Sequence, residues 1–288
     1  ESRITRRQEV EKLDIQQDIR DRARELLTSG SVTCVVGYEM GTLGVRPAFI
    51  YTPEEADRLV WNEQCTYNVV NYLRDKRGKK VAVVVKPCDS RGLNILLHEG
   101  QVKREEVHVL GVPCQGTIWK GVTDPRCALC AEHMPSIYDE LFGEQPSTPA
   151  AADEYEDVAK FDALSPAERE AFWQKQWDKC IRCYACRQAC FGCYCTECVA
   201  EQLEPTWQSI AINRPEKQFF LLMRAYHLAG RCVECNECER ACPMGIPLHL
   251  LNRKVAKEVG DMFEGYRAGL DPAVKPVLTT FKKDEHPD

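Results

Sequence analysis

Two runs of four cysteines constrain this sequence more than any other feature. Both follow the pattern C-x-x-C-x-x-C-x-x-x-C. The first run is Cys180, Cys183, Cys186 and Cys190, and the second run is Cys232, Cys235, Cys238 and Cys242. In two-cluster iron–sulfur proteins, three closely spaced thiolates hold one 4Fe–4S cluster and the fourth residue of the run ligates the other cluster. We therefore expect two clusters with crossed ligation, in which Cys242 completes the first set of ligands and Cys190 completes the second.

A zinc site is the alternative reading of these runs. Zinc needs only four ligands, which usually come as two separated pairs, so two complete copies of a four-cysteine run favour clusters. The one departure from the iron–sulfur pattern is at the end of the first run, where Phe191 follows Cys190. Pro243 follows Cys242 in the second run.

Nine of the 17 cysteines lie outside the two runs. Cys88 and Cys114 each follow an apolar segment that we predict to be a buried strand, at residues 81–85 and 107–112. Parallel strands place ligands at their carboxyl ends, and a C-x-x-C pair follows shortly after. We predict a third 4Fe–4S cluster on Cys88, Cys114, Cys127 and Cys130. The alternatives are inert buried cysteines, or a zinc site that includes His133.

Two further groups of residues are candidate binding positions. The helix after Cys88 would direct its N-terminal N–H groups at an anionic cofactor, with positive charge added by Lys86 and Arg91. Gly37, Gly41 and Gly44 follow a predicted strand and are candidates for cradling a flavin phosphate. Their spacing is not G-x-G-x-x-G, so a plain glycine turn is the alternative.

A third dense group of cysteines follows the first run. Cys193, Cys195 and Cys198 supply three thiols within six residues. With Cys34 or Cys65 they would complete a further metal site. The alternatives are spare thiols beside the first cluster, or replacements for Cys190. Trp173, Trp177 and Trp207 flank the first run, and packing with exclusion of solvent explains them.

The pattern of apolar residues divides the chain into two parts. Strands at 31–37, 81–85 and 107–112 alternate with helical segments at 9–27, 53–58, 65–76 and 90–98, which predicts an α/β domain with a parallel sheet. Residues 143–165 are rich in proline and acidic residues and read as a linker, or as a long surface loop of one domain. We place the domains at 1–150 and 151–288.

The second part is predicted to be all-helical. Helices are expected at 166–177 and 215–229, and from residue 247 onward, and no segment there reads as a convincing strand. The inward residues are predicted to be Phe219, Leu222, Met223 and Tyr226 in one helix, and Leu248, Leu251, Val255, Val259 and Met262 in the next.

Composition narrows the class of protein. The net charge of −6 argues against a nucleic-acid partner, and no run of about 18 apolar residues predicts a transmembrane helix. The polar, charged first residues do not resemble a secretory leader. Abundant thiols inside a cell indicate metal or redox chemistry more often than disulfides, so we expect a cytoplasmic protein.

Several motifs together resemble one known family. These are Lys86-Pro87-Cys88-Asp89-Ser90-Arg91, Gly111-Val112-Pro113-Cys114-Gln115-Gly116, the Cys127/Cys130 pair before Pro135 and Tyr138, and Trp177 to Cys186 continuing to Cys195. They resemble the iron–sulfur beta subunits of deazaflavin-linked hydrogenases and formate dehydrogenases, with relatives in heterodisulfide-reductase-type complexes. The likeness covers about residues 37–251. The 41 residues between Cys190 and Cys232 resemble the insert of the helical dicluster ferredoxin domain.

The resemblance implies an electron-relay subunit of a larger anaerobic oxidoreductase. Such a subunit passes single electrons between a catalytic partner and a flavin, deazaflavin or ferredoxin carrier. The competing hypothesis is a flavin-containing enzyme subunit that itself reduces a small carrier such as a deazaflavin. Some family members bind FAD in the α/β part, but this sequence has no clear FAD fingerprint.

Overall fold

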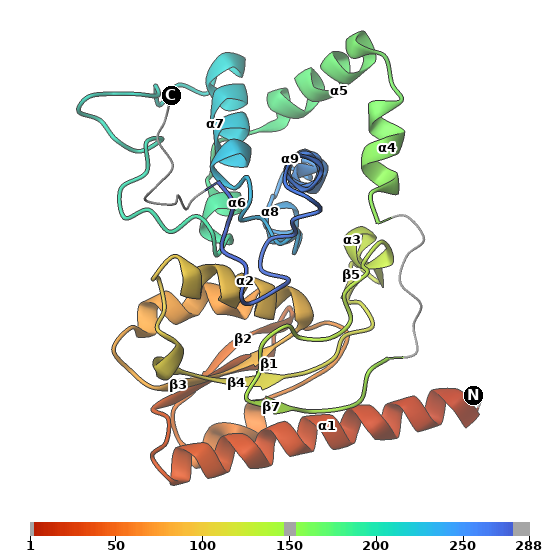
Figure 1. Cartoon of the computed structure of the whole chain (residues 1–288), viewed down its shortest axis with the longest axis vertical. Coiled ribbons are helices and arrows are strands. Elements are labelled where there is room, and N and C mark those ends of the chain that lie inside the picture. Colours follow the sequence, from red (N-terminus) through yellow and green to blue (C-terminus); the bar gives the residue numbers. More distant parts are fainter. Residues whose placement is uncertain (1–2, 147–153, 279–288) are drawn as a thin grey trace. The chain divides into compact units, whose positions relative to one another are not determined.

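The computed structural model describes residues 3–146 and 154–278, and the chain divides into two compact units (Figure 1). One unit is Glu1–Ala152 together with the short segment Gly269–Val274. The other is Asp153–Ala268 together with Lys275–Asp288. The predicted boundary after residue 150 lies close to this division. The return of Gly269–Val274 to the first unit has no recognisable signal in the sequence.

A five-stranded sheet forms the centre of the first unit. Its strands are β1 (Cys34–Gly41), β2 (Gly44–Ile50), β3 (Val81–Val85), β4 (Val107–Gly111) and β7 (Glu140–Leu141), in the spatial order β2-β1-β3-β4-β7. The neighbours β1, β3, β4 and β7 pair in parallel, as predicted for the first three. Strand β2 was not predicted. It forms an antiparallel hairpin with β1.

Helices cover both faces of this sheet, as Figure 1 shows for α1 (Arg3–Thr28) and α2 (Pro87–His98). All five residues of β3 are buried, which agrees with their uninterrupted apolar sequence. On one face, Ile19, Ala23 and Leu26 of α1 join Ala82 and Val84 in a single core cluster. This arrangement brings the loops after β3 and β4 to the same edge of the sheet.

Short elements complete the first unit. The predicted helical segments at 53–58 and 65–76 are 3-10 helices, η1 (Pro53–Arg58) and η2 (Val69–Lys76), and η3 spans Arg104–Glu106. A small ribbon of β5 (Ile118–Trp119) and β6 (Val122–Thr123) precedes α3 (Pro125–Ala128). The segment Gly269–Val274 binds α2, because Asn94 Nδ2 donates to Gly269 O at 2.9 Å and His98 Nε2 lies 2.9 Å from Pro272 O.

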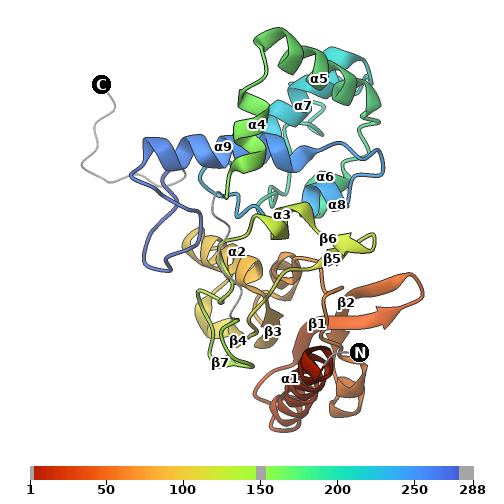
Figure 2. The same cartoon turned by 90° about the vertical axis from the view of Figure 1, so that its right-hand side faces the viewer.

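The described part of the second unit contains helices and no named strand. Its elements are α4 (Glu156–Asp162), α5 (Pro166–Lys179), α6 (Ala185–Gln188), α7 (Arg214–His227), α8 (Glu237–Arg240) and α9 (Leu248–Met262). Helix α9 contacts α4, α7 and α8, and Figure 2 shows it alongside α4. The predicted start of α5 is confirmed: Ser165 accepts from Glu168 N, and Glu168 accepts in return from Ser165 N.

The prediction of a linker at residues 143–165 is partly wrong. Residues 156–162, inside the acidic stretch, form α4 instead of an extended connection. Two basic residues of α9 explain this, because Arg253 pairs with Asp157 and Lys254 pairs with Asp162. Residues 147–153 of the predicted linker lie outside the described residues.

The predicted inward faces of two helices are also partly wrong. In α7 the buried residues are Phe220, Leu221, Arg224 and Ala225, whereas Phe219 and Tyr226 are 49% and 67% exposed. In α9 the buried residues are Leu248, Asn252, Arg253 and Val259, and Met262 is exposed. The apolar periodicity misses these faces because Arg224, Asn252 and Arg253 turn toward the cysteine loops.

None of the helices in the described part of the chain combines the length and the apolar character that crossing a membrane requires.

Candidate metal centres

The cysteines of the two runs line two pockets in the second unit. One pocket is lined by Cys180, Cys183, Cys186 and Cys242, which we call the first cysteine set. The other is lined by Cys190, Cys232, Cys235 and Cys238, the second cysteine set. Each run therefore contributes three residues to one pocket and its last cysteine to the other. These are the two groups that crossed ligation predicts.

The two runs share one unusual backbone conformation. Arg182 and Tyr184 in the first run have φ of 52° and 58°, and Glu234 and Asn236 in the second have φ of 60° and 64°. Left-handed φ values are uncommon for residues with a side chain. They bend each loop around its pocket before α6 or α8 begins. Arg182 N donates to Cys180 Sγ at 3.4 Å in the first loop.

Apolar side chains line the pocket of the first cysteine set, although Cys183 itself is exposed. Tyr184, Phe220 and Ile246 line the pocket, and Tyr184 meets Phe220 edge to face at a centroid distance of 4.9 Å. Trp173 stacks on Trp177 at 4.9 Å, and Trp177 is buried, so packing explains these two residues. Trp207 differs from the prediction, since 65% of it is exposed and it excludes little solvent.

Polar side chains surround the second cysteine set. Arg224, Asn252 and Arg253 line the pocket, and Asn252 Nδ2 donates to Cys238 Sγ at 3.3 Å. Burial raises the pKa of the Cys238 thiol to about 12, while the charge of Arg224 acts to lower it. Thiols of this kind release protons when a metal binds, so binding and deprotonation are coupled. Sequence reasoning missed Arg224 and Asn252. The one sequence signal that could have found them is the presence of a polar residue on a helix face that is otherwise apolar.

The three cysteines after the first run do not share one environment. Cys193 lies beside Cys190, and a hydrogen bond between the two thiols lowers the pKa of Cys190. Cys195 is exposed, and Cys198 packs against the core that contains Trp177. Cys34 and Cys65 belong to the first unit. The further metal site predicted on these residues therefore stays a prediction.

The four cysteines of the predicted third cluster all belong to the first unit. Cys88 lies in the first turn of α2, Cys114 follows β4, Cys127 lies in α3 and Cys130 follows it. Burial raises the pKa of the Cys114 thiol to about 12. A hydrogen bond from Gly116 N and the charge of Lys86 oppose this rise, and the nearby Cys127 and Cys130 add to it. Cys114, Cys127 and Cys130 are therefore electrostatic neighbours.

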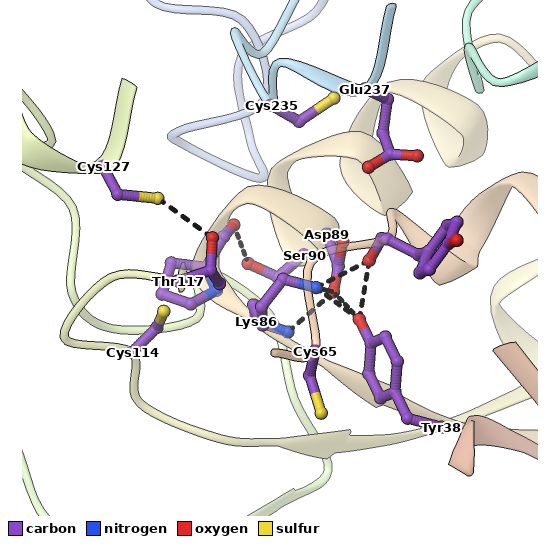
Figure 3. Close-up of polar contacts among 12 residues, drawn as sticks. Tyr38, Cys65, Lys86, Asp89, Ser90, Cys114, Thr117, Cys127, Cys235 and Glu237 are labelled. Carbon is purple, nitrogen blue, oxygen red and sulfur yellow. Dashed lines mark hydrogen bonds and ion pairs between the residues drawn. The ribbon is translucent and has the colours of Figure 1, made fainter. Parts of the chain in front are cut away.

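Local hydrogen bonds hold this region in place. Cys127 Sγ lies 3.4 Å from Thr117 Oγ1 (Figure 3). His133, the candidate zinc ligand, has Nδ1 2.9 Å from Cys114 O, and its buried Nε2 has no hydrogen-bond partner in the described structure. Across residues 3–146 and 154–278, no three His, Cys, Asp or Glu side chains come close enough together to hold a single metal ion.

Lys86 is buried and fully engaged within the protein. Its ammonium group donates to Tyr38 Oη, to Tyr67 O at 2.7 Å and to Asp89 Oδ2 at 2.8 Å (Figure 3). Burial alone would lower the pKa of Lys86, but the Asp89 carboxylate raises it above its usual value. Lys86 therefore stabilises the start of α2, and Arg91 is buried within the same helix. Their predicted role toward an anionic cofactor stays a prediction.

The three candidate glycines lie in the β1–β2 hairpin. Gly41 pairs with Gly44 where the chain reverses, and Gly44 has φ of 113°. Gly37 lies inside β1, where a Cβ atom would come within 2.8 Å of Leu59 Cδ2. This geometry favours the glycine-turn alternative. A phosphate cradle at these positions stays a prediction without structural support.

Comparison with known proteins supports the family resemblance. No protein-family model matches the chain. The chain is 35% identical over 106 residues to the F420-dependent formate dehydrogenase subunit beta of Methanocaldococcus jannaschii. The matched region covers 37% of this chain and 27% of that protein. It is 32% identical over 110 residues to the F420-dependent formate dehydrogenase 1 subunit beta of Methanococcus maripaludis, and this match covers 37% of the chain and 26% of the relative.

The chain spans about a quarter of the length of the curated relatives it matches. Within the matched residues, these similarities confirm the resemblance to beta subunits of deazaflavin-linked formate dehydrogenases. Both relatives are named as subunits of an oxidoreductase.

Proposed function

We propose that this chain is an electron-transfer subunit of an oxidoreductase complex and carries two 4Fe–4S clusters in its second unit. The observation that carries this proposal is the composition of the two pockets. Each is lined by three cysteines of one run and the last cysteine of the other. Bacterial-type two-cluster ferredoxins use their cysteines in this crossed order.

The chain's own residues provide the surroundings that such clusters need. The first cysteine set would hold one cluster and the second set the other, and each cluster would supply a one-electron redox couple. Phe220 and Ile246 are buried apolar residues that line the pocket of the first set, in which Cys183 alone is exposed. Asn252 donates to a sulfur of the second set. Because each run serves both sets, the two sites are tied together in the chain.

The names of the relatives suggest the rest of the complex. They are beta subunits of F420-dependent formate dehydrogenases. On that basis, the partner would be a subunit that oxidises formate, and the electron acceptor would be a deazaflavin carrier in the cytoplasm. A third cluster on Cys88, Cys114, Cys127 and Cys130 would extend the relay into the first unit.

Iron and acid-labile sulfide, measured per chain after anaerobic preparation, test the proposal. About eight irons are expected for two clusters and about twelve if the third is present. Two double variants test the crossing, because each removes two cysteines. Cys180→Ala with Cys242→Ala removes two ligands of one set, so about four irons should be lost. Cys180→Ala with Cys190→Ala removes one ligand from each set, so about eight should be lost.

The reverse order of losses would show that each run holds its own cluster. A folded wild-type chain that contains neither iron nor sulfide after anaerobic preparation would overturn the proposal as a whole.

A further inference from the structure

Arg224 is a buried arginine of α7 that contacts both cysteine sets. Only 4% of its surface is exposed. Its Nη2 donates to the backbone carbonyl of Cys186, a member of the first set, at 3.0 Å. The same side chain lines the pocket of the second set, together with Cys190 and Cys238. Its guanidinium therefore adjoins both proposed clusters.

Within the described residues, the charge of Arg224 has no carboxylate partner. Two other buried arginines of this unit are paired with carboxylates: Arg253 with Glu234, and Arg187 with Glu201. Arg182 is also buried, but its guanidinium donates to the carbonyls of Ser209 and Ala211 and to Tyr184 Oη. Among residues 3–146 and 154–278, Arg224 forms no ion pair with Asp or Glu, and its buried Nε has no hydrogen-bond partner. An isolated buried charge is costly, because no water or counter-ion stabilises it. An anion at the cysteine sets would supply the missing compensation.

The neighbours of Arg224 agree with this reading. Burial alone would lower the pKa of Arg224, but the surrounding cysteines, Cys190 first among them, raise it well above its usual value. Arg224 lines the same pocket as Cys190 and Cys238, and a positive charge beside a thiol favours its thiolate form. The thiolate form is the one that a cluster requires.

We propose that Arg224 is a positioning residue that raises the reduction potentials of both clusters by holding one positive charge, which no described carboxylate neutralises, beside both cysteine sets. The inference rests on the proposed function. Reduction adds negative charge to a cluster, and a nearby cation stabilises the reduced form more than the oxidised form. The effect is large in a buried site, where the effective dielectric constant is low. Loss of the charge should therefore lower both potentials.

Redox titration of the full-length, cluster-loaded protein, followed by EPR, tests this inference. In Arg224→Gln, which removes the charge but keeps a donor for the Cys186 carbonyl, both midpoint potentials should fall. A tenfold change in the equilibrium constant is about 59 mV for a one-electron couple, and we expect at least that. Arg224→Lys keeps the charge and should retain potentials close to those of the wild type.

Arg214→Gln is the matched control. It removes the same charge from the same helix, but the Arg214 side chain is 48% exposed and pairs with Asp178. Solvent and salt screen such a charge, so its loss should leave both potentials unchanged.

Three results would overturn the inference while leaving the proposed function intact. The first is a wild-type chain with both clusters whose potentials do not change in Arg224→Gln. The second is an equal shift in Arg224→Lys and Arg224→Gln, which would assign the effect to packing. The third is loss of iron from Arg224→Gln and Arg224→Lys alike, which would assign Arg224 a structural role. A wild-type chain without clusters would overturn the proposed function itself.

Discussion

Arg253 Nη1 and Glu234 Oε2 are 2.9 Å apart, and the two side chains are only 1% and 2% exposed. Glu234 lies between Cys232 and Cys235 in the second run, and Arg253 comes from α9. The same guanidinium also pairs with Asp157 of α4, where Nε lies 2.9 Å from Oδ2. One buried arginine therefore connects two helices to the loop that carries three of the four cysteines of the second set.

Arg253→Met is expected to destabilise the second unit strongly. Removal of one member of a buried ion pair leaves an uncompensated charge, which typically costs about 3–5 kcal/mol. The free energy of unfolding, measured by urea denaturation, should fall by that amount, and iron bound by the second set should decrease. The neighbouring variant Lys254→Met is the control. Its pairs with Asp162 and Glu258 are partly exposed, and such pairs contribute about 0–1 kcal/mol. Equal losses from the two variants would contradict the assigned role of Arg253.

The sheet elements were predictable where the sequence pattern is local. The segment 81–85 is apolar at every position and forms β3 with the predicted bounds. Strand β2 was missed because Gly44, Arg46 and Pro47 interrupt its apolar pattern, and only pairing with β1 makes this segment a strand. Helix α4 was missed for a related reason, since its acidic residues are paired by Arg253 and Lys254, which lie about ninety positions further along the chain.

In the candidate site, too, the sequence predicted the features that depend on local spacing and missed those that depend on distant contacts. The spacing of the cysteines predicted which residues line each pocket, because a run of fixed spacing is a local feature. The polar residues around those pockets were not predictable. Arg224 lies on α7 and Asn252 on α9, and the sequence indicates the buried faces of these helices only through the spacing of apolar residues. That spacing wrongly predicted that Phe219 and Tyr226 are buried.

Gly269→Ala is expected to weaken the attachment of the segment 269–274 to α2. Gly269 has φ of 66°, and a Cβ atom there would collide with the backbone carbonyl of Arg91. A left-handed conformation alone costs an alanine roughly 1–2 kcal/mol, and the collision adds to this. Gly100→Ala is the control, because Gly100 has φ of 62° with no atom within 4 Å of the added Cβ. Urea denaturation should show a larger loss for Gly269→Ala, with faster proteolysis near residue 269. Equal losses would mean that the contact with Arg91 relaxes freely.

Glu39 is expected to contribute to the loss of stability in acid. It accepts hydrogen bonds from Arg46 of β2 and Arg58 of η1. Burial alone would raise the pKa of Glu39, but these two arginines hold it below its usual value. A carboxylate with a lowered native pKa stabilises the fold above its unfolded pKa of about 4.3, and this contribution is lost as the pH falls through the native pKa. Glu39→Gln should therefore cost stability at pH 7 and progressively less below about pH 4.3. The measurement is the free energy of unfolding of both proteins as a function of pH. A difference between variant and wild type that stays constant from neutral to acidic pH would contradict this prediction.

Cys114→Ser tests the third cluster and is expected to lower iron by one cluster's worth, about four irons, with the EPR signals of the C-terminal pair unchanged. The physical reason is the position of Cys114, whose thiol is buried and lies close enough to Cys127 and Cys130 for their charges to affect it. Cys34→Ala is the control, since Cys34 is a buried cysteine of the same unit that lies at the start of β1, where it pairs with Val81. An unchanged iron content in Cys114→Ser would contradict the prediction of a third cluster. Loss of zinc instead of iron would favour the alternative site, in which the buried Nε2 of His133 finds its partner in a metal ion.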